Sequence, residues 1–328
     1  MLNGNILKID QIYHLLHINL LAMIEKIFKY SFFALLLTLF GCREIPVKKD
    51  DLLADDVRLY QRTPAWTLAK AVDDQNINEI NRQVLEEKIP VDFKEKKFGL
   101  TLLMYAVITN KIHSVQRLLE LRADPNLPND SLTDSGMNAV IFACDVPNVS
   151  PQILRLLLKY GGNPNSMECG RNFDIEGDWT PARRSALSYA IPLFGKFDKV
   201  KILVEMGADV NRCGDGQNSP LMDAIVLDRM DVALYLLEHG ADYHCKYKIY
   251  DPSFGEDGHY VDILYMLRQC IYPLDSQEYK DKLKVVKFLK DRGMDYWETP
   301  IPEYVIDDIK KQIKPKNNAE LQYYLKRY

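Results

Sequence analysis

Cysteine is scarce in this sequence, with six residues among 328. Small scaffolds held together by disulfides are short and dense in cysteine, so that class of protein is excluded. Lys and Arg form no continuous basic run, and the formal net charge at pH 7 is -4. Because binding of phosphate groups needs a concentrated basic surface, the sequence argues against a nucleic-acid partner.

The sequence also lacks the short signatures of common active sites. It contains no G-x-S-x-G, H-E-x-x-H, P-loop or G-x-G-x-x-G motif, and such motifs carry the nucleophiles, metal ligands and phosphate-binding turns of many enzymes. No periodicity brings a serine, a histidine and a carboxylate together. We therefore expect no catalytic residues, no cofactor and no enzymatic activity.

No apolar run reaches the roughly 20 residues that a membrane-spanning helix needs. A shorter apolar run, Ser31 to Phe40, follows Lys26 and Lys29 and ends at Gly41-Cys42. A positive region followed by a short apolar region is typical of a secretory signal peptide. The sequence therefore predicts an N-terminal extension and a signal peptide over residues 1–41.

The four residues Leu39-Phe40-Gly41-Cys42 resemble the bacterial lipobox. In lipoproteins of that kind the cysteine thiol is acylated and the preceding peptide is removed, so the resemblance implies that Cys42 carries a lipid. Phe40 departs from the small residue that is usual at its position. Met1 and Met23 both remain candidates for the first translated residue.

The segment 42–62 is charged, contains a proline and has no strong apolar period. We expect it to form the lipidated cysteine and a stem that holds the protein at a membrane face. Arg43 follows Cys42, whereas an Asp at that position commonly retains such lipoproteins in the inner membrane. The resemblance thus implies a periplasmic, lipid-anchored protein, at the outer membrane rather than the inner one.

Four segments of the chain repeat one another, and each places a small residue before a Leu-rich stretch and a variant of Gly-Ala-Asp-x-Asn. The segments are Gly99–Asn126, Asn138–Asn165, Ser185–Asn211 and Ser219–His244. This pattern resembles the ankyrin repeat, a helix-turn-helix unit that stacks on its neighbours. Four alanines at the small position are expected to lie where helices of adjacent repeats approach closely: Ala106, Ala143, Ala190 and Ala224.

Two degenerate repeats flank these four, over Trp66 to Asp92 and Val261 to Trp297. Atypical end repeats are expected because each must shield an open face of the core. We therefore predict an all-α solenoid of ankyrin repeats over 63–297, with about five to six helix-turn-helix units and long β-hairpin fingers. Residues 298–328 are expected to add C-terminal capping helices.

Insertions distinguish this chain from a regular ankyrin array. Small ones fall between the two helices of a repeat, around Pro147 to Pro151 and around Pro192 to Gly195. Larger ones fall between repeats, at 127–137, 166–184 and 245–260. The last two are rich in Trp, Tyr, Phe and Arg, which are typical of binding surfaces. The expected partner-binding residues are Arg171, Phe173, Trp179, Arg183, Arg184, Tyr247, Tyr250, Phe254 and Tyr260.

Histidines and cysteines near the last finger raise the question of a metal. His244 and Cys245 are adjacent and lack a paired spacing such as C-x-x-C, and the stretch that ends at His259 does not match a calcium-binding loop. We expect no metal site. Cys144 and Cys270 are expected in the core, and the disulfide state of the other three is open: Cys169, Cys213 and Cys245.

These features together predict a membrane-tethered protein–protein interaction module with one protein partner, monomeric when alone. The combination resembles ankyrin-repeat lipoproteins that act as immunity proteins against secreted antibacterial toxins, some of which are phospholipases. Two alternatives stay open: a structural scaffold lipoprotein of an envelope complex, and an anchored metal or redox sensor.

Overall fold

The computed structural model describes residues 48–129, 135–173, 179–181, 183–213, 218–249 and 259–328. The chain divides into two compact units, Met1–Asp51 and Leu52–Tyr328. Of the first unit only residues 48–51 are described, including the short helix η1 (Lys49–Asp51). Cys42 therefore lies outside the described residues. None of the helices in the described ranges is long and apolar enough to cross a membrane.

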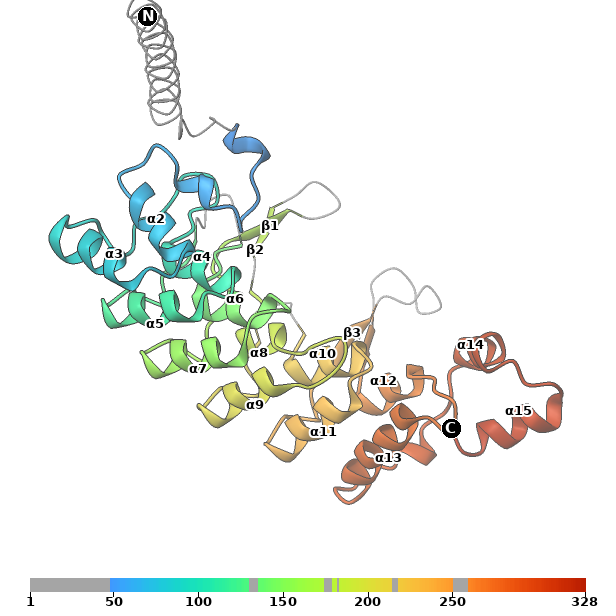
Figure 1. The fold of residues 1–328 in the computed structure, drawn as a ribbon. Coiled ribbons are helices and arrows are strands. Elements are labelled where there is room, and N and C mark those ends of the chain that lie inside the picture. The colour runs from blue at the N-terminus through green and yellow to red at the C-terminus, as the bar shows by residue number, and fades with distance from the viewer. Residues whose placement is uncertain (1–47, 130–134, 174–178, 182, 214–217, 250–258) are drawn as a thin grey trace, which may run out of the picture. The chain divides into compact units, whose positions relative to one another are not determined.

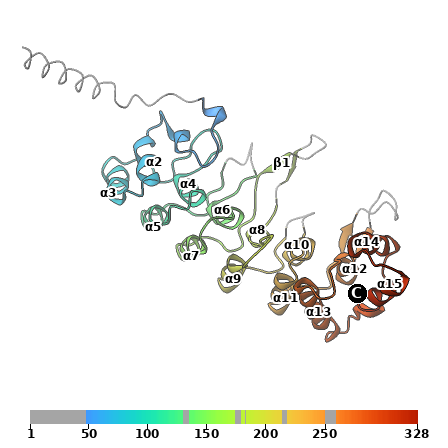
Figure 2. The same cartoon turned by 45° about the vertical axis from the view of Figure 1, so that its right-hand side comes forward.

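Within the described residues of the second unit, six helix pairs are arranged in two rows (Figures 1 and 2). The first row holds α2 (Trp66–Asp73), α4 (Leu102–Ile108), α6 (Ala139–Asp145), α8 (Ala186–Tyr189), α10 (Pro220–Val226) and α12 (Ile263–Gln269). The second row holds α3 (Ile77–Asn81) with η3 (Arg82–Glu86), α5 (Ile112–Glu120), α7 (Pro151–Lys159), α9 (Asp198–Glu205), α11 (Met230–Glu238) and α13 (Gln277–Lys290). Successive helices of the first row contact one another from α2 to α12. The prediction of an ankyrin-type solenoid is confirmed.

Each first-row helix from α4 onward begins at a side chain that caps it. The capping oxygen accepts a hydrogen bond from the backbone N–H three residues later, which satisfies a donor that the helix leaves unpaired. The caps are Thr101, Asn138, Ser185, Ser219 and Asp262. The four alanines at the small position are almost fully buried, as expected for closely packed helices.

Each second-row helix ends at a residue with left-handed backbone, a conformation that glycine adopts without strain. Gly161, Gly207 and Gly240 have φ of 94°, 89° and 92°, which confirms their expected role. The repeat that ends at Asn126 has Arg122 at this point instead, with φ of 69°. That arginine, like Lys88 at the equivalent point of the first repeat (φ of 60°), therefore carries backbone strain that the repeats with glycine avoid.

A ladder of asparagine side chains joins the turns of neighbouring repeats. Asn165 Oδ1 accepts from the Asp209 backbone N–H at 2.7 Å, and Asn165 Nδ2 donates to the Gly207 carbonyl at 3.4 Å. The same two bonds extend from Asn126 and from Asn211 to the next turn along the chain. The ladder therefore adds hydrogen bonds to the packing that holds successive repeats together.

Two of the insertions between repeats form antiparallel hairpins, which we name finger 1 (166–184) and finger 2 (245–260). In finger 1, β1 (Arg171–Phe173) pairs with β2 (Trp179–Pro181), and Phe173 lies opposite Trp179. In finger 2, β3 (Tyr247–Ile249) pairs with β4 (His259–Val261). Both hairpins project from the side of the repeats where the chain enters the first-row helices (Figure 1).

Two helices, α14 (Glu303–Ile313) and α15 (Asn318–Leu325), follow the last repeat after the short η5 (Tyr296–Glu298). Val305 and Ile309 of α14 pack with Tyr324 and Tyr328 in a small buried cluster of their own. Arg268 of α12 ties this cluster to the repeats, because its guanidinium donates to the carbonyl of Tyr328 at 2.7 Å.

The start of the second unit packs on the first repeat. Leu59 and Tyr60 of η2 (Val57–Tyr60) are fully buried, and Tyr60 Oη donates to the Leu100 carbonyl at 3.0 Å. This contact involves part of the segment that we expect to form the stem, 42–62. From Leu52 onward, that segment belongs to the same compact unit as the repeats.

Candidate partner-binding surface

The two small insertions that interrupt the repeats line one cavity. Pro147 and Val149 come from the turn between α6 and α7, and Pro151 begins α7. Pro192 and Leu193 come from the turn between α8 and α9. The cavity has a volume of about 640 Å³, and its wall on the side of the first-row helices includes charged and aromatic side chains. We call it the α6–α8 cavity.

Arg184, one of the residues expected to bind a partner, lines this cavity at the base of finger 1. Its guanidinium lies 4.5 Å from the centroid of the Tyr189 ring, and it also donates to the Ser188 carbonyl at 3.2 Å. Arg184 Nε stands 3.9 Å from Asp223 Oδ2 of α10. The arginine is thus held in place by two successive repeats, and its side chain is 37% exposed.

Glu168 connects finger 1 to helix α8. Tyr189 Oη donates to Glu168 Oε1 at 2.7 Å, and the Arg184 backbone N–H donates to Glu168 Oε2 at 3.0 Å. Glu168 is only 3% exposed, so both bonds are shielded from water. The base of finger 1 is therefore fixed before any partner arrives, which reduces the entropy that binding would cost.

Partial burial disfavours the charged forms of the ionisable groups in and near the cavity. Burial raises the pKa of Asp145, and the positive charges of Arg184 and Lys199 partly offset that effect. Burial also lowers the pKa of Lys199, whose Nζ donates to the Val146 carbonyl at 2.8 Å. Burial raises the pKa of Asp223 in the same way. Such clusters of perturbed groups next to an open cavity are typical of binding sites.

The other expected residues of finger 1 fall into two groups. Arg171 is exposed on β1, and Arg183 Nη1 donates to the Gly170 carbonyl at 3.3 Å. The backbones of Phe173 and Trp179 pair across the hairpin, while their side chains lie outside the described residues. Their proposed role in binding stays a prediction.

In finger 2 the structure separates two of the expected residues. Tyr260 is 68% exposed and free to meet a partner. Tyr247 is 6% exposed, and burial raises the pKa of its hydroxyl to about 12. Tyr247 is therefore buried in this structure, unlike Tyr260, and its assignment to the binding surface stays a prediction. Tyr250 and Phe254 lie outside the described residues.

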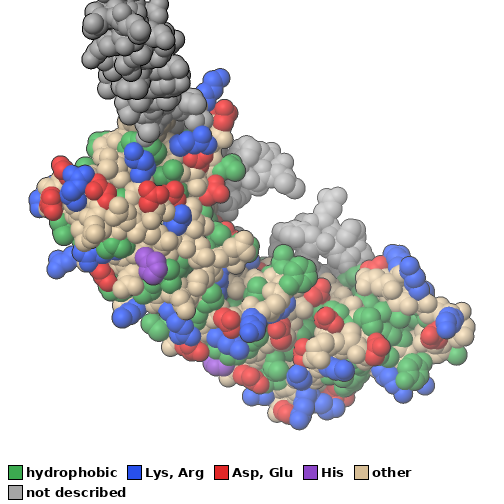
Figure 3. All heavy atoms as spheres, viewed as in Figure 1, with side chains coloured by type: hydrophobic (Ala, Val, Ile, Leu, Met, Phe, Trp, Pro, Cys, Tyr) green, Lys and Arg blue, Asp and Glu red, His purple; other side chains and the backbone are tan. Residues whose placement is uncertain are grey.

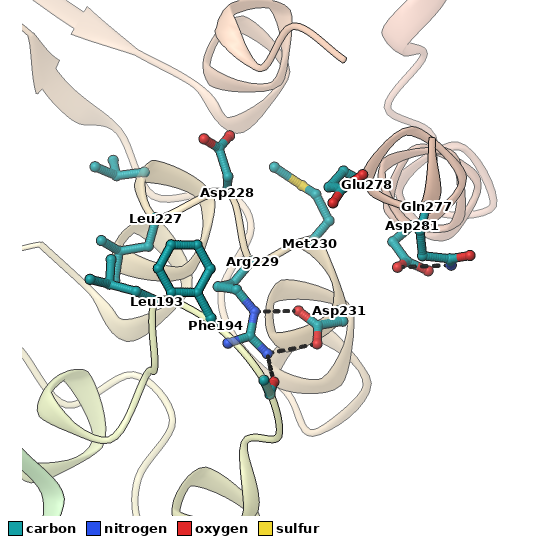
Figure 4. A pocket seen from close by; sticks show the side chains of 12 residues that line it. Leu193, Phe194, Leu227, Asp228, Arg229, Met230, Asp231, Gln277, Glu278 and Asp281 are labelled. Atoms are coloured by element: carbon teal, nitrogen blue, oxygen red, sulfur yellow. Dashed lines mark hydrogen bonds and ion pairs between the residues drawn. The ribbon is translucent and has the colours of Figure 1, made fainter. Parts of the chain in front are cut away.

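Sequence reasoning missed the most exposed apolar side chains of the turn between α8 and α9. Leu193 is 60% exposed and Phe194 is 87% exposed. They stand between the α6–α8 cavity and a second cavity of about 520 Å³, which Figure 4 shows with its lining side chains. The sequence signal for these side chains is the insertion around Pro192 to Gly195, which interrupts the repeat.

Cysteines and metal ligands form no cluster in the described part of the chain. The described cysteines are all free thiols: Cys144 and Cys270 are buried, Cys169 and Cys213 are exposed, and Cys245 is half-buried. Burial and the neighbouring Asp242 carboxylate raise the pKa of Cys245 to about 11. Within the described ranges, His, Cys, Asp and Glu side chains make no group of three that could hold a metal ion.

The charges on the surface are mixed. On the face drawn in Figure 3, Lys and Arg side chains alternate with Asp and Glu side chains over the repeats. A face of this kind does not single out a partner by its overall charge. The charge of this face therefore indicates no particular partner, and the local features described above, Arg184 at the base of finger 1 and the exposed turn with Leu193 and Phe194, are the more distinctive ones.

Comparison with known proteins assigns the fold to a family. The family model described as ankyrin repeats (3 copies) matches residues 68–168 and 169–247, more than half of the chain. No curated protein matches the chain at a significant level. Among solved structures, the ankyrin repeat domain of Bcl-3, a unique member of the IkappaB protein family, is 23% identical with a TM-score of 0.49. That match covers 70% of this chain and 86% of the Bcl-3 chain. The protein belongs to the ankyrin-repeat family.

Proposed function

We propose that this protein is a lipid-anchored binding protein of the bacterial periplasm that holds one protein partner against its fingers and the Arg184 site. The Arg184 site comprises Arg184, Tyr189, Asp223 and the α6–α8 cavity. The observation that carries the proposal is the preformed geometry at the base of finger 1. There Arg184 is fixed over Tyr189 and beside Asp223, and it opens onto a cavity of about 640 Å³.

The composition of this site favours a protein as the ligand. Arg and Tyr are enriched among the residues that dominate binding energy at protein interfaces, especially where neighbouring contacts exclude water. Here both stand at the rim of a cavity that a partner side chain can enter. Stacked repeats are also rigid, so the solenoid loses little conformational entropy when it binds.

The anchor in this proposal rests on the sequence. Cys42 follows a short apolar run with positive flanks, and the four residues that end at Cys42 resemble a lipobox. Acyl chains on Cys42 hold the protein at the membrane surface. The lipid faces the periplasm, and the outer membrane is favoured because Arg43 rather than Asp follows the cysteine.

The partner in this proposal is a secreted toxin, which the protein neutralises as an immunity protein. Long fingers suit that task because they can enter the active-site cleft of an enzyme such as a phospholipase. The combination of an anchor, repeats and fingers resembles such immunity proteins in architecture. A resident protein of the envelope, held by a structural scaffold, is the competing partner.

The test is a pull-down with the chain from Arg43 to Tyr328 against the products of neighbouring genes, followed by titration calorimetry. This chain keeps the whole compact unit Leu52–Tyr328. We expect a one-to-one complex that suppresses the activity of a toxic enzyme and that weakens with Trp179→Ala and Tyr250→Ala. Failure to bind any of these products, together with recovery of abundant envelope proteins, would favour the scaffold.

A further inference from the structure

Three exposed apolar side chains form a ridge beside two cavities. Leu193, Phe194 and Val226 are 60%, 87% and 53% exposed, and we call them the 193–226 ridge. The α6–α8 cavity and the cavity of about 520 Å³ share three wall residues: Leu193, Phe194 and Leu227. Figure 4 shows the second cavity, with Phe194 on one side and Glu278 of α13 on the other. A partner segment that leaves the α6–α8 cavity over this wall therefore enters the second cavity.

The turn that carries most of the ridge is held in place by Arg229. Its guanidinium donates to the carbonyls of Pro192 at 2.6 Å and Gly195 at 2.9 Å. These two residues stand immediately before and after Leu193 and Phe194 in the chain. The Arg229 side chain is only 9% exposed, so its bonds are shielded from water. Exposed apolar side chains on a fixed backbone lose little entropy when a partner covers them, and such groups are typical of interaction surfaces.

The second cavity has an excess of negative charge, and we call it the acidic cavity. Its charged lining residues are Asp228, Asp231, Glu278, Asp281 and Arg229. Asp231 accepts two hydrogen bonds from Arg229, at 2.9 and 2.8 Å. Asp281 Oδ1 stands 2.6 Å from Lys284 Nζ. Two of the four carboxylates are therefore paired with a cation of the same chain.

The other two carboxylates of the acidic cavity belong to Asp228 and Glu278, which are both exposed. In the described part of the chain, neither forms an ion pair. Asp228 Oδ1 accepts a hydrogen bond of 2.6 Å from the Tyr272 hydroxyl, which leaves the charge of the carboxylate in place. Asp228 and Glu278 are therefore available to a cation from outside the chain.

The α6–α8 cavity has no such excess. Its charged lining residues are three basic and two acidic ones: Arg184, Lys196, Lys199, Asp145 and Asp198. Asp223, which stands 3.9 Å from Arg184 Nε, adds a third carboxylate. Three positive and three negative charges balance there, so of the two cavities only the acidic one selects a partner by its charge.

The ridge and the two available carboxylates together select a basic side chain. A wholly apolar segment would cover the ridge, but it would remove water from Asp228 and Glu278 without supplying a cation, which is costly. An acidic segment would meet two like charges. Lys and Arg have an apolar stem that covers side chains such as Phe194 and Val226, and a cationic head that reaches carboxylates beyond them. A cation over the ring of Phe194 is itself favourable.

We infer that the partner segment that enters the α6–α8 cavity continues over the 193–226 ridge and places a Lys or Arg side chain in the acidic cavity. The inference rests on the function proposed above, because it takes the Arg184 site as the place where the partner binds. It adds the chemistry of the partner: an uncharged residue for the α6–α8 cavity, whose charges balance, close to a basic residue for the acidic cavity.

Selection from a library of short random peptides displayed on phage, with the chain from Arg43 to Tyr328 as bait, tests this chemistry without a captured partner. We expect the selected peptides to share a Lys or Arg close to an apolar or aromatic residue. One selected peptide, synthesised with a fluorescent label, then serves as the probe, and fluorescence polarisation measures its affinity for the chain. Because part of the contact is between opposite charges at the surface, the affinity should fall as the salt concentration rises.

Neutral variants test the two carboxylates. Asp228→Asn and Glu278→Gln are each expected to weaken binding of the probe about threefold or more, and the double variant at least about tenfold. Asparagine can keep the hydrogen bond with Tyr272, and it tolerates the left-handed backbone of Asp228, whose φ is 57°. Glu238→Gln is the matched control, because Glu238 is exposed on α11 and lies outside the lining of the cavity. It should bind the probe like the wild type.

Two further variants test whether one segment spans both cavities. Phe194→Ser removes the aromatic part of the shared wall, and Arg184→Ala removes a cation of the α6–α8 cavity. Each is expected to weaken binding of the probe about tenfold, the effect typical of an anchor residue. Leu85→Ser, at a side chain that is 50% exposed on η3, is the control for Phe194→Ser and should leave the affinity unchanged.

Selected peptides that lack a basic residue, or the absence of any enriched peptide, overturn the inference. So does a probe whose affinity survives the double variant of Asp228 and Glu278. If Arg184→Ala weakens the probe and the double variant does not, the Arg184 site stands and only the inference fails. If the double variant weakens the probe and Arg184→Ala does not, no single segment spans both cavities, which also contradicts the inference. Failure of the pull-down alone counts against the immunity function and leaves the peptide result intact.

Discussion

The guanidinium of Arg184 lies over the ring of Tyr189, 4.5 Å from its centroid, and this contact joins finger 1 to the first-row helices. Arg184 ends finger 1 and Tyr189 belongs to α8. Arg184 also lies next to Asp223 of the following repeat, and both residues line the α6–α8 cavity. The position of the finger is consequently coupled to the stacking of the repeats. Variants that loosen the stacking should therefore affect binding as well as stability.

The bond between Tyr189 and Glu168 gives the first prediction. Tyr189→Phe removes the 2.7 Å hydrogen bond to a carboxylate that is 3% exposed. We expect a loss of about 1–3 kcal/mol in the free energy of unfolding, since a hydrogen bond to a charged group is lost. Tyr160→Phe, at a residue that is 37% exposed, is the control and should change little. Urea unfolding of both variants measures the effect, and equal stabilities would contradict it.

The asparagine ladder gives the second prediction. Asn165→Ala removes the bonds of 2.7 and 3.4 Å that join two repeats. We expect the free energy of unfolding to fall by about 1–2 kcal/mol, as two modest hydrogen bonds are lost. Asn78 is exposed on α3, and Asn78→Ala should leave stability unchanged or slightly higher, because alanine favours helix. Thermal unfolding compares the two, and an unaffected Asn165 variant would refute the importance of the ladder.

The strained residue Arg122 gives the third prediction. Its φ of 69° is left-handed, so Arg122→Gly relieves strain and is expected to stabilise the protein by up to about 1 kcal/mol. Gly207→Ala should do the reverse, because Gly207 has φ of 89° and an added Cβ would meet no atom within 4 Å. Any loss of stability in Gly207→Ala therefore comes from backbone strain alone. Thermal unfolding midpoints that move in the same direction for both variants would contradict this explanation.

The buried lysine of α13 gives the fourth prediction. Lys282 is 1% exposed, its Nζ lies 3.8 Å from the centroid of the Tyr328 ring, and burial lowers its pKa from 10.5 to about 7. Between these two pH values the unfolded chain binds more protons at this residue than the folded chain does. The contribution of Lys282 therefore makes the free energy of unfolding rise with pH across that window.

Urea unfolding at a series of pH values within the same window measures that slope. Lys282→Met should flatten it, because the titrating group is gone. Lys284→Met is the matched control on the same helix, as the Lys284 side chain is 58% exposed, and it should keep the slope of the wild type. A Lys282 variant with an unchanged slope would show that another group is responsible.

Much of the fold could be predicted because the repeat pattern is local. The alanines at the small position and the glycines at Gly161, Gly207 and Gly240 each follow from short-range packing and backbone geometry, and the structure places them as expected. Arg184 was also predicted as a binding residue, since it ends an aromatic-rich and arginine-rich insertion. What the sequence did not reveal was its partner Asp223, which belongs to the next repeat.

The parts that could not be predicted depend on contacts between distant segments. The α6–α8 cavity needs two insertions that belong to successive repeats, so no single window of sequence describes it. Phe194 lies in a turn, but the sequence does not predict how exposed its side chain is, because exposure depends on the neighbouring segments. The burial of Tyr247 likewise depends on neighbours that the sequence around it does not show.

The central claim is that a protein partner is bound at the Arg184 site, and calorimetric titration of a captured partner tests it most directly. Arg184→Ala should weaken binding at least tenfold, the effect expected of an anchor residue. Arg155→Ala is the matched control, because Arg155 lies on α7 and its side chain is 55% exposed in a surface ion pair with Glu205. Equal affinities of the two variants, each folded as judged by circular dichroism, would contradict the account.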